Sequence, residues 1–101
     1  MAIKKQYLKT KPLAKVTLSL PAEAAPDAQE VKVAGDFTNW KPSRKMRKLK
    51  NGEFKLTVDL PVDKSYQFRY LIDGNKWEND WSADDYVNNG VSYEDNSVIT
   101  L

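Results

Sequence analysis

Trp40 is the first residue whose type and surroundings suggest a binding role. It ends the stretch V-A-G-D-F-T-N-W, residues 33–40, and the polar run Lys41-Pro42-Ser43-Arg44 follows it. These neighbours predict an exposed indole, whereas Phe37 lies close enough to a strand end to turn back into the core. An exposed indole offers a flat apolar surface with one N–H at its edge. Burial as a packing residue is the alternative for Trp40.

The residue inventory excludes several kinds of chemistry. The 101 residues contain no Cys and no His, which excludes disulfides, thiol chemistry, the usual zinc sites and His-based catalytic triads. With 30% charged residues and a net charge of +2, the chain is predicted to be globular and not strongly attracted to polyanions. We expect no cofactor and no metal. The absence of Cys fits a cytoplasmic protein.

Basic residues gather in two parts of the chain. Six of them lie between Lys41 and Lys50, but Met46 and Leu49 are interleaved with them, which favours a short strand with solvated lysines and arginines. Aromatic residues that could stack on bases are not interleaved, so we expect no nucleic-acid binding. The segment from Met1 to Thr10 carries lysines without an apolar run, so we expect neither a signal peptide nor contact with a membrane.

Alternating apolar and polar residues predict the strands that must position the candidate residues. The clearest is 66–72, in which Tyr66, Phe68, Tyr70 and Ile72 share a core face and leave Arg69 and Leu71 on the outward face. Similar patterns predict strands at 15–20, 30–34, 54–60 and 97–101. The pattern predicts a loop at 22–29 and a short strand at 76–81 that carries Trp77 and Trp81.

The turn signals complete the predicted fold. Asn51-Gly52 predicts a two-residue hairpin turn, Asp73-Gly74-Asn75 a second turn, and residues 84–90 a long polar loop. About seven short strands with such spacing predict an all-β, immunoglobulin-like antiparallel β-sandwich. We assign residues 15–101 to this domain. Residues 1–14 form a basic segment that is either an edge strand or loosely attached.

Four motifs, taken in order, resemble carbohydrate-binding module family 48, also known as the isoamylase N-terminal or early-set domain. They are the stretch at 33–40, N-G-E-F-K-L-T-V-D-L-P at 51–61, Y-Q-F-R-Y-L-I-D-G at 66–74 and N-S-V-I-T-L at 96–101. The chain is therefore similar to the glycogen-binding domain of AMP-activated protein kinase β subunits. The resemblance implies an early-set sandwich that binds α-1,4-linked glucan, a glycogen-like or starch-like polysaccharide or a maltooligosaccharide, without catalysis.

The resemblance also implies roles for single residues. Trp40 and Trp77 match two sugar-stacking tryptophans, Arg69 a basic residue that bonds sugar hydroxyls, and Asn96 an asparagine that contacts sugar. The chain departs from the pattern in three places. Arg69 stands where Lys is typical, one residue is inserted between Gly74 and Trp77, and Trp81 stands where Pro is common.

Physical chemistry supports a sugar ligand for such residues. A pyranose ring has an apolar face of C–H groups and a rim of hydroxyls, so a flat aromatic suits its face and polar groups suit its edge. Arg69 would supply a rigid fork of donors, and Asn96 a donor and an acceptor. Each contact is weak, so retention on a polymer depends on avidity.

Each candidate also has a structural explanation. Trp77, like Trp40, could pack inward, and Trp81 is either a packing residue or a third aromatic platform. Arg69 could form a cross-strand ion pair with Asp59 or Glu53, and Asn96 could cap a turn. Leu71, included among the candidates, is an exposed apolar residue of an ordinary kind.

Two other functions compete with sugar binding. Glycoside hydrolysis needs two carboxylates about 5 to 10 Å apart in a cleft, and the aspartates available for it are Asp73, Asp80, Asp84 and Asp85. They stand in turn-like stretches with no evident cleft, so we expect no enzyme activity. Alternatively, the tryptophan patch could bind a protein, either an α-glucan enzyme or a second copy of the chain.

Overall fold

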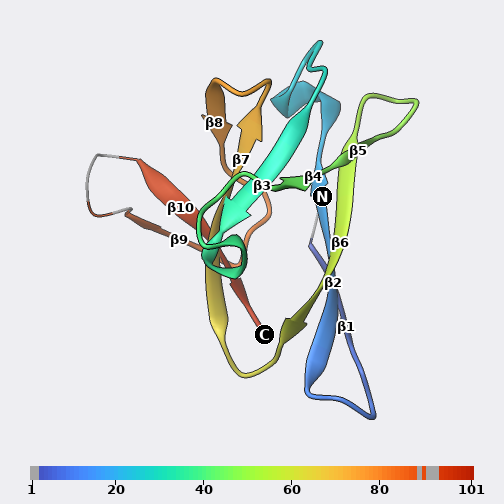
Figure 1. Cartoon of the computed structure of the whole chain (residues 1–101), viewed down its shortest axis with the longest axis vertical. Coiled ribbons are helices and arrows are strands. Elements are labelled where there is room, and N and C mark those ends of the chain that lie inside the picture. Colours follow the sequence, from blue (N-terminus) through green and yellow to red (C-terminus); the bar gives the residue numbers. More distant parts are fainter. Residues whose placement is uncertain (1–2, 89, 91–93) are drawn as a thin grey trace.

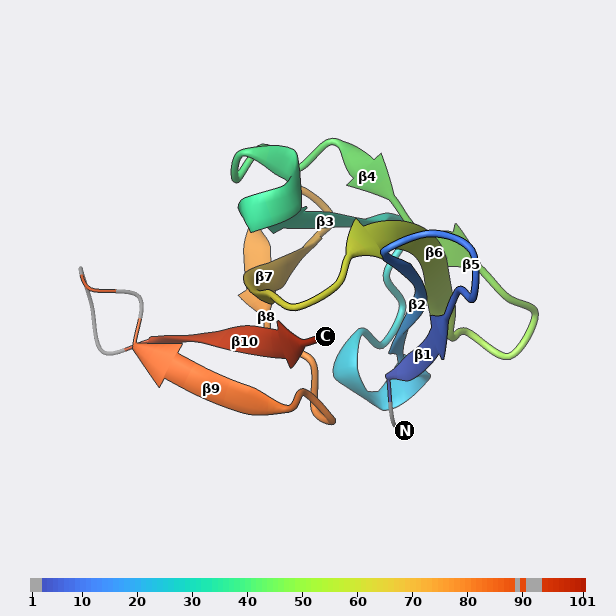
Figure 2. The same ribbon diagram turned by 90° about the horizontal axis from the view of Figure 1, so that it is seen from below.

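The computed structural model describes residues 3–88, 90 and 94–101, and these form two antiparallel β-sheets packed face to face (Figures 1 and 2). The strands are β1 (Lys4–Tyr7), β2 (Leu13–Leu20), β3 (Val31–Gly35), β4 (Arg44–Lys45), β5 (Arg47–Lys48), β6 (Phe54–Pro61), β7 (Ser65–Ile72), β8 (Lys76–Glu78), β9 (Asp85–Asn88) and β10 (Asp95–Thr100). One sheet has the order β1-β2-β6-β5. The other has the order β4-β3-β7-β10-β9, with β8 paired to β7. The predicted all-β, immunoglobulin-like sandwich is confirmed.

The core lies between the two sheets and follows the predicted alternation. Val16, Leu18 and Leu20 on β2 face Phe68 and Tyr70 on β7, and all five are fully buried in one apolar cluster. The alternate residues of β7, at positions 67, 69 and 71, stay partly exposed on the outer face of the six-stranded sheet. Close packing on one face therefore fixes which side chains the other face presents.

Two short 3₁₀ helices connect the strands. Ala22–Ala24 forms η1 within the predicted loop, and Asp36–Thr38 forms η2 directly after β3. The basic run crosses from one sheet to the other at Met46, which is buried between β4 and β5. Within the described residues no helix has the length and apolar character needed to cross a bilayer.

Three local expectations differ from the structure. The turn at Asn51-Gly52 is a three-residue loop, because Leu49 pairs with Glu53 and only Gly52 adopts a positive φ, of 90°. The predicted polar loop at 84–90 contains β9, which pairs with β10; Asn89 lies outside the described residues. Trp81 lies in the turn after β8, not in a strand. The basic N-terminal segment contains β1, an edge strand paired with β2.

Candidate functional site: a hollow on the six-stranded sheet

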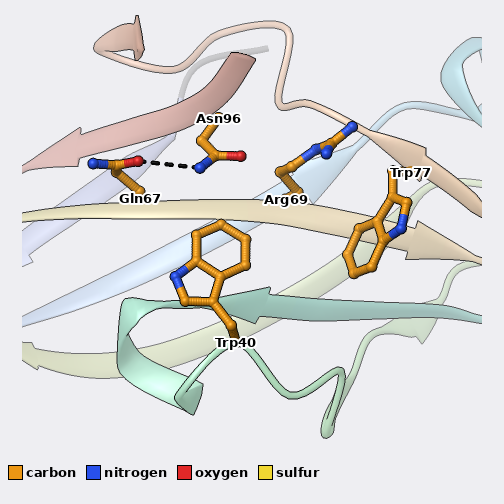
Figure 3. Close-up of a pocket in the computed structure, with 5 residues that line it drawn as sticks. All are labelled: Trp40, Gln67, Arg69, Trp77 and Asn96. Carbon is orange, nitrogen blue, oxygen red and sulfur yellow. Dashed lines mark hydrogen bonds between the residues drawn. The ribbon is translucent and has the colours of Figure 1, made fainter. Parts of the chain in front are cut away.

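A hollow of about 510 Å³ opens on the outer face of the six-stranded sheet. It is lined by five residues from the turn after η2 and from the strands β7, β8 and β10: Trp40, Gln67, Arg69, Trp77 and Asn96. Figure 3 shows these side chains around the middle of β7, with Gln67 and Asn96 at one end and Trp77 at the other. Four of the five belong to the set predicted from sequence, and they come together although up to 56 positions separate them.

Trp40 is positioned by the turn that follows β3. Asn39 and Trp40 both adopt left-handed backbone conformations, with φ of 54° and 60°, which is rare for a bulky residue. The Trp40 N–H donates to the Gly35 carbonyl at 2.9 Å, and its indole Nε1–H donates to Asp36 Oδ1 at 2.9 Å. Trp40 is 38% exposed, and hydrogen bonds hold both its backbone N–H and the edge of its indole ring.

Asp36 links this turn to β7. Its second carboxylate oxygen, Oδ2, accepts the backbone N–H of Gln67 at 2.8 Å. The N–H at the edge of the indole is already bonded to Asp36 in the structure, so Trp40 presents its ring faces to a ligand. Asp36 therefore fixes Trp40 against the strand that carries Gln67 and Arg69.

Trp77 reaches the hollow from β8, where it is 41% exposed and stands directly across from Leu71 on β7. The Arg69 guanidinium carbon lies 5.4 Å from the centroid of the Trp77 ring, a cation–π contact. The turn before Trp77, with positive φ at Asp73 and Gly74, is held by Asp73 Oδ1, which accepts the N–H groups of Gln29 and Glu30 at 2.9 Å each.

Arg69 is more constrained than its outward position suggests. Only 12% of its side chain is exposed, and Nη2 lies 3.0 Å from Glu94 Oε2. The expected alternative, an ion pair with Asp59 or Glu53, is wrong: the acid is Glu94, just before β10. The Nε atom is buried and has no hydrogen-bond partner in the described part of the chain. Arg69, which lines the hollow, thus contacts both Trp77 on β8 and Glu94, the residue before β10.

Asn96 and Gln67 form the polar end of the hollow. Asn96 Nδ2 donates to Gln67 Oε1 at 3.1 Å, across the β7–β10 pair, so Asn96 does not merely cap a turn. Figure 3 shows the Asn96 side-chain oxygen pointing toward Arg69. Gln67 was not among the predicted residues. Its place on the outward face of 66–72 was predicted, but its contact with Asn96 depends on the register of two distant strands.

Two predicted site residues do not line this hollow. Leu71 is half-buried on β7 and lies opposite Trp77. Trp81 is 54% exposed, which argues against the packing role that was one of its two interpretations. It stands in the turn between β8 and β9. The hollow itself is formed without either side chain.

Three of the aspartates considered for hydrolysis are held by other contacts. Asp73 accepts the two backbone N–H groups already described, and Asp84 contacts Lys5. Asp80 is buried, and Tyr70 Oη donates to its Oδ2 at 2.6 Å. Burial raises the pKa of Asp80 more than its hydrogen bonds from Tyr70 and Ser82 lower it. Within residues 3–88, 90 and 94–101, no group of three or more acidic, His or Cys side chains is placed to hold a metal ion.

Comparison with known proteins gives two matches. Residues 24–96 match the family model for the glycogen recognition site of AMP-activated protein kinase. The chain is also 36% identical over 72 residues to the chloroplastic protein PTST homolog 2 of Arabidopsis thaliana. That stretch is 71% of this chain but 13% of the length of the plant protein. The family match spans residues 24–96, so it includes all five residues that line the hollow.

Proposed function

Because the chain belongs to the family of the glycogen recognition site of AMP-activated protein kinase, we propose that it is a non-catalytic module that binds α-1,4-linked glucan in the hollow lined by Trp40 and Trp77. A carbohydrate-binding role agrees with this family. The observation that carries the finer proposal is the meeting of two exposed indoles and three polar side chains in one open hollow of about 510 Å³.

In this proposal the two tryptophans contact the apolar faces of successive glucose units. Trp40 is fixed by Asp36, and Trp77 by the Arg69 guanidinium, so little ring motion remains to be lost on binding. The side-chain oxygen of Asn96, the amide of Gln67 and the N–H groups of Arg69 that Glu94 leaves unused bind sugar hydroxyls. Stacking contributes about 1 kcal/mol per ring beyond burial, so dissociation constants for short oligosaccharides should be roughly micromolar to millimolar.

Native gel electrophoresis with and without glycogen or amylopectin tests this proposal. Because the net charge of the protein is +2 at pH 7, the gel is run at neutral pH, where the protein migrates toward the cathode. We expect the wild-type protein to be retarded by the polysaccharide, and Trp40→Ala to lose most of that retardation while it keeps its β-sheet circular dichroism. Tyr7→Ala is the matched control, because Tyr7 is a 54% exposed aromatic on β1 of the other sheet.

The same gel can contradict the proposal. A wild-type protein that moves like a non-binding standard at every polysaccharide concentration would not be a glucan-binding module. The exposed tryptophans would then favour the alternative stated above, docking to an α-glucan enzyme or self-association. Glucan-release assays under the same conditions check the absence of hydrolysis.

A further inference from the structure

Two exposed aromatic residues outside the hollow lie next to each other in the fold. Trp81 is 54% exposed in the turn after β8, and Tyr86 is 41% exposed on the edge strand β9. The Tyr86 hydroxyl donates to the carbonyl of Asp80, the residue before Trp81, at 2.6 Å. The two rings therefore belong to one small surface at the β8–β9 connection.

This surface is held in place by a buried network around Asp80. Asp80 is 1% exposed; its N–H donates to Ser97 Oγ at 2.9 Å, and its Oδ1 accepts the N–H of Ser82 at 2.7 Å. The backbone is thus fixed on both sides of Trp81, and the Tyr86 ring is fixed by its hydroxyl. Two large aromatic rings are exposed to water here and do not contribute to the core. Exposed apolar side chains held on a rigid turn are typical of a binding surface.

The surface faces away from the hollow. In the β9–β10 pair, Tyr86 stands opposite Ser97, whereas Asn96 stands opposite Val87. Because alternate residues of a strand point to opposite faces, Tyr86 and Asn96 project from opposite sides of the same two-stranded ribbon. Asn96 lines the hollow and Trp81 does not. Figure 2 shows β9 at the edge of its sheet, with the turn before it well away from η2.

We propose that Trp81 and Tyr86 form a second carbohydrate-contacting surface, which binds a different stretch of α-glucan from the one in the hollow. This inference rests on the proposed function. A sugar suits the surface better than a protein does: two aromatic side chains bury at most about 150–250 Å² each, well below the roughly 800 Å² per partner of a stable protein interface. The hydroxyl of Ser82, which follows Trp81 in the turn, can donate to and accept from sugar hydroxyls.

Two surfaces on opposite sides of one module would give it a bridging activity. A single glucan helix could not cover both, so two chains, or two branches of one particle, would be held by one molecule. Once one surface is bound, the other surface meets nearby glucan at a high effective concentration. Two weak contacts would therefore retain the protein on a branched polymer better than either contact alone.

Indole NMR signals test the inference directly. The chain has three tryptophans, so its Nε1–H signals can be assigned with Trp40→Phe, Trp77→Phe and Trp81→Phe. With maltoheptaose as the probe, we expect all three signals to shift in the wild-type protein. In Trp40→Ala, which disables the hollow, the Trp81 signal should still shift.

Bridging gives a second measurement. We expect wild-type protein to raise the light scattering of dilute glycogen, and both Trp81→Ala and Trp40→Ala to lose this increase. Trp81→Ala should still bind maltoheptaose at the hollow with less than a twofold change in affinity. Tyr86→Ala should behave like Trp81→Ala, which guards against misfolding of a single variant. Tyr7→Ala should behave like the wild type, which controls for the loss of an exposed aromatic residue elsewhere on the protein.

The outcomes separate this inference from the proposed function. If maltoheptaose shifts the Trp40 and Trp77 signals but leaves Trp81 unmoved at saturation, the second surface does not bind glucan, so this inference fails while the proposed function of the hollow stands. If no indole signal moves, both proposals fail.

Discussion

Trp40 has a backbone conformation that the sequence pattern did not predict. A left-handed φ costs a bulky residue about 1–3 kcal/mol, and the chain keeps it at two successive positions, Asn39 and Trp40. The hydrogen bonds from Trp40 to Gly35 and Asp36 maintain the conformation. Strain of this kind is common where a side chain must be aimed at a ligand. The turn therefore presents the indole to the hollow at some expense of stability.

Replacing Asp36 should weaken glucan binding without removing any ligand contact. Asp36→Ala frees the indole edge and the Gln67 N–H, both of which now bond to one carboxylate. A hydrogen bond to a charged group is worth about 1.5–3 kcal/mol, and part of this loss should appear as about a threefold to tenfold weaker affinity for maltoheptaose, measured by calorimetry. Asp59→Ala, on an exposed position of β6, is the control. Equal affinities of the two variants would contradict this role for Asp36.

Arg69 should act on the ligand partly through Trp77. Its guanidinium lies over that ring and is tied to Glu94, so Arg69→Met should loosen Trp77 as well as remove sugar contacts. A cation–π contact of this kind is worth about 0.5–1 kcal/mol at an exposed site. We expect the Trp77 Nε1–H signal to broaden or shift in the absence of sugar, and affinity to fall about threefold or more.

A matched variant exists elsewhere in the chain. Lys64 lies 5.8 Å from the centroid of the Tyr66 ring, outside the hollow, so Lys64→Met removes a cation from another aromatic ring. It should leave both the Trp77 signal and the affinity unchanged. A free Trp77 signal that is identical in Arg69→Met and wild type would show that Arg69 does not orient the ring.

The residues of the hollow were predictable to different degrees. Trp40, with its polar flanks, carried a signal of its own, and Trp77, Arg69 and Asn96 were assigned by the family motifs. Gln67 and Glu94 had no local signal, because a polar residue on an outward face is ordinary. Their contacts arise from pairing between β7 and β10, which lie about 30 positions apart in the sequence and whose register no single segment encodes.

At the scale of elements, prediction succeeded where burial on one face imposes alternation. The strands β2 and β7 bury every second residue, and β6 does so except at Leu56, which is partly buried, so their patterns were clear. The strand β9 was missed because it lies at a sheet edge and has the polar sequence D-Y-V-N, in which nothing is fully buried. The hairpin loop at Asn51-Gly52 was misjudged by one residue, since its length depends on the pairing of Leu49 with Glu53.

Gly35 controls how closely β3 approaches β7. A Cβ at this position would lie 2.6 Å from the Gln67 carbonyl oxygen and 2.7 Å from Phe68 Cβ, although φ itself is extended and unstrained. Gly35→Ala should therefore force the two strands apart and destabilise the fold by about 1–3 kcal/mol, measured by urea unfolding. Because Gly35 also accepts the Trp40 N–H, folded Gly35→Ala should bind glucan more weakly than wild type.

Alanine at another glycine gives the comparison. A Cβ at Gly74 would meet no atom within 4 Å, but φ there is 74°, so Gly74→Ala adds backbone strain without a clash. We expect a smaller loss of stability there, of the order of 1 kcal/mol. A Gly35→Ala protein as stable as wild type would show that β3 and β7 can separate freely.

At the scale of the whole molecule, the two sheets are joined at one open side by a charged contact. Lys5, on the edge strand β1, donates from Nζ to Asp84 Oδ2 at 2.5 Å and to the Thr100 carbonyl at 3.1 Å. Asp84 precedes β9 at the edge of the other sheet and also accepts the Thr100 N–H at 2.8 Å. This contact links the first and last strands of the chain, so it closes the sandwich beside the proposed second surface.

The pH dependence of stability should report this contact. Burial would raise the pKa of Asp84, but the hydrogen bonds from Lys5 and Thr100 and the charge of Lys5 outweigh it, so the folded-state pKa lies below the ordinary value of 3.8. The stabilisation is therefore present above pH 3.8 and is lost as pH falls through the lowered pKa. Asp80 has the opposite effect on the pH dependence of stability. Its folded-state pKa is raised, so its contribution to stability is present below pH 3.8 and is lost as pH rises through the raised pKa.

Comparing variants separates most of the Asp84 contribution from that of Asp80, because both proteins keep Asp80 and the Asp84 charge is only the smallest of the causes that shift the Asp80 pKa. Asp84→Asn should have a lower melting temperature than wild type at neutral pH, and the difference should shrink as pH falls below about 4, because the wild-type carboxylate then becomes protonated too. Lys5→Met should show the same convergence, since it removes the other half of the contact. Differential scanning calorimetry from about pH 2.5 to 7 measures this. A difference that is constant across that range would show that Asp84 stabilises the sandwich by shape and neutral hydrogen bonds, not by its charge.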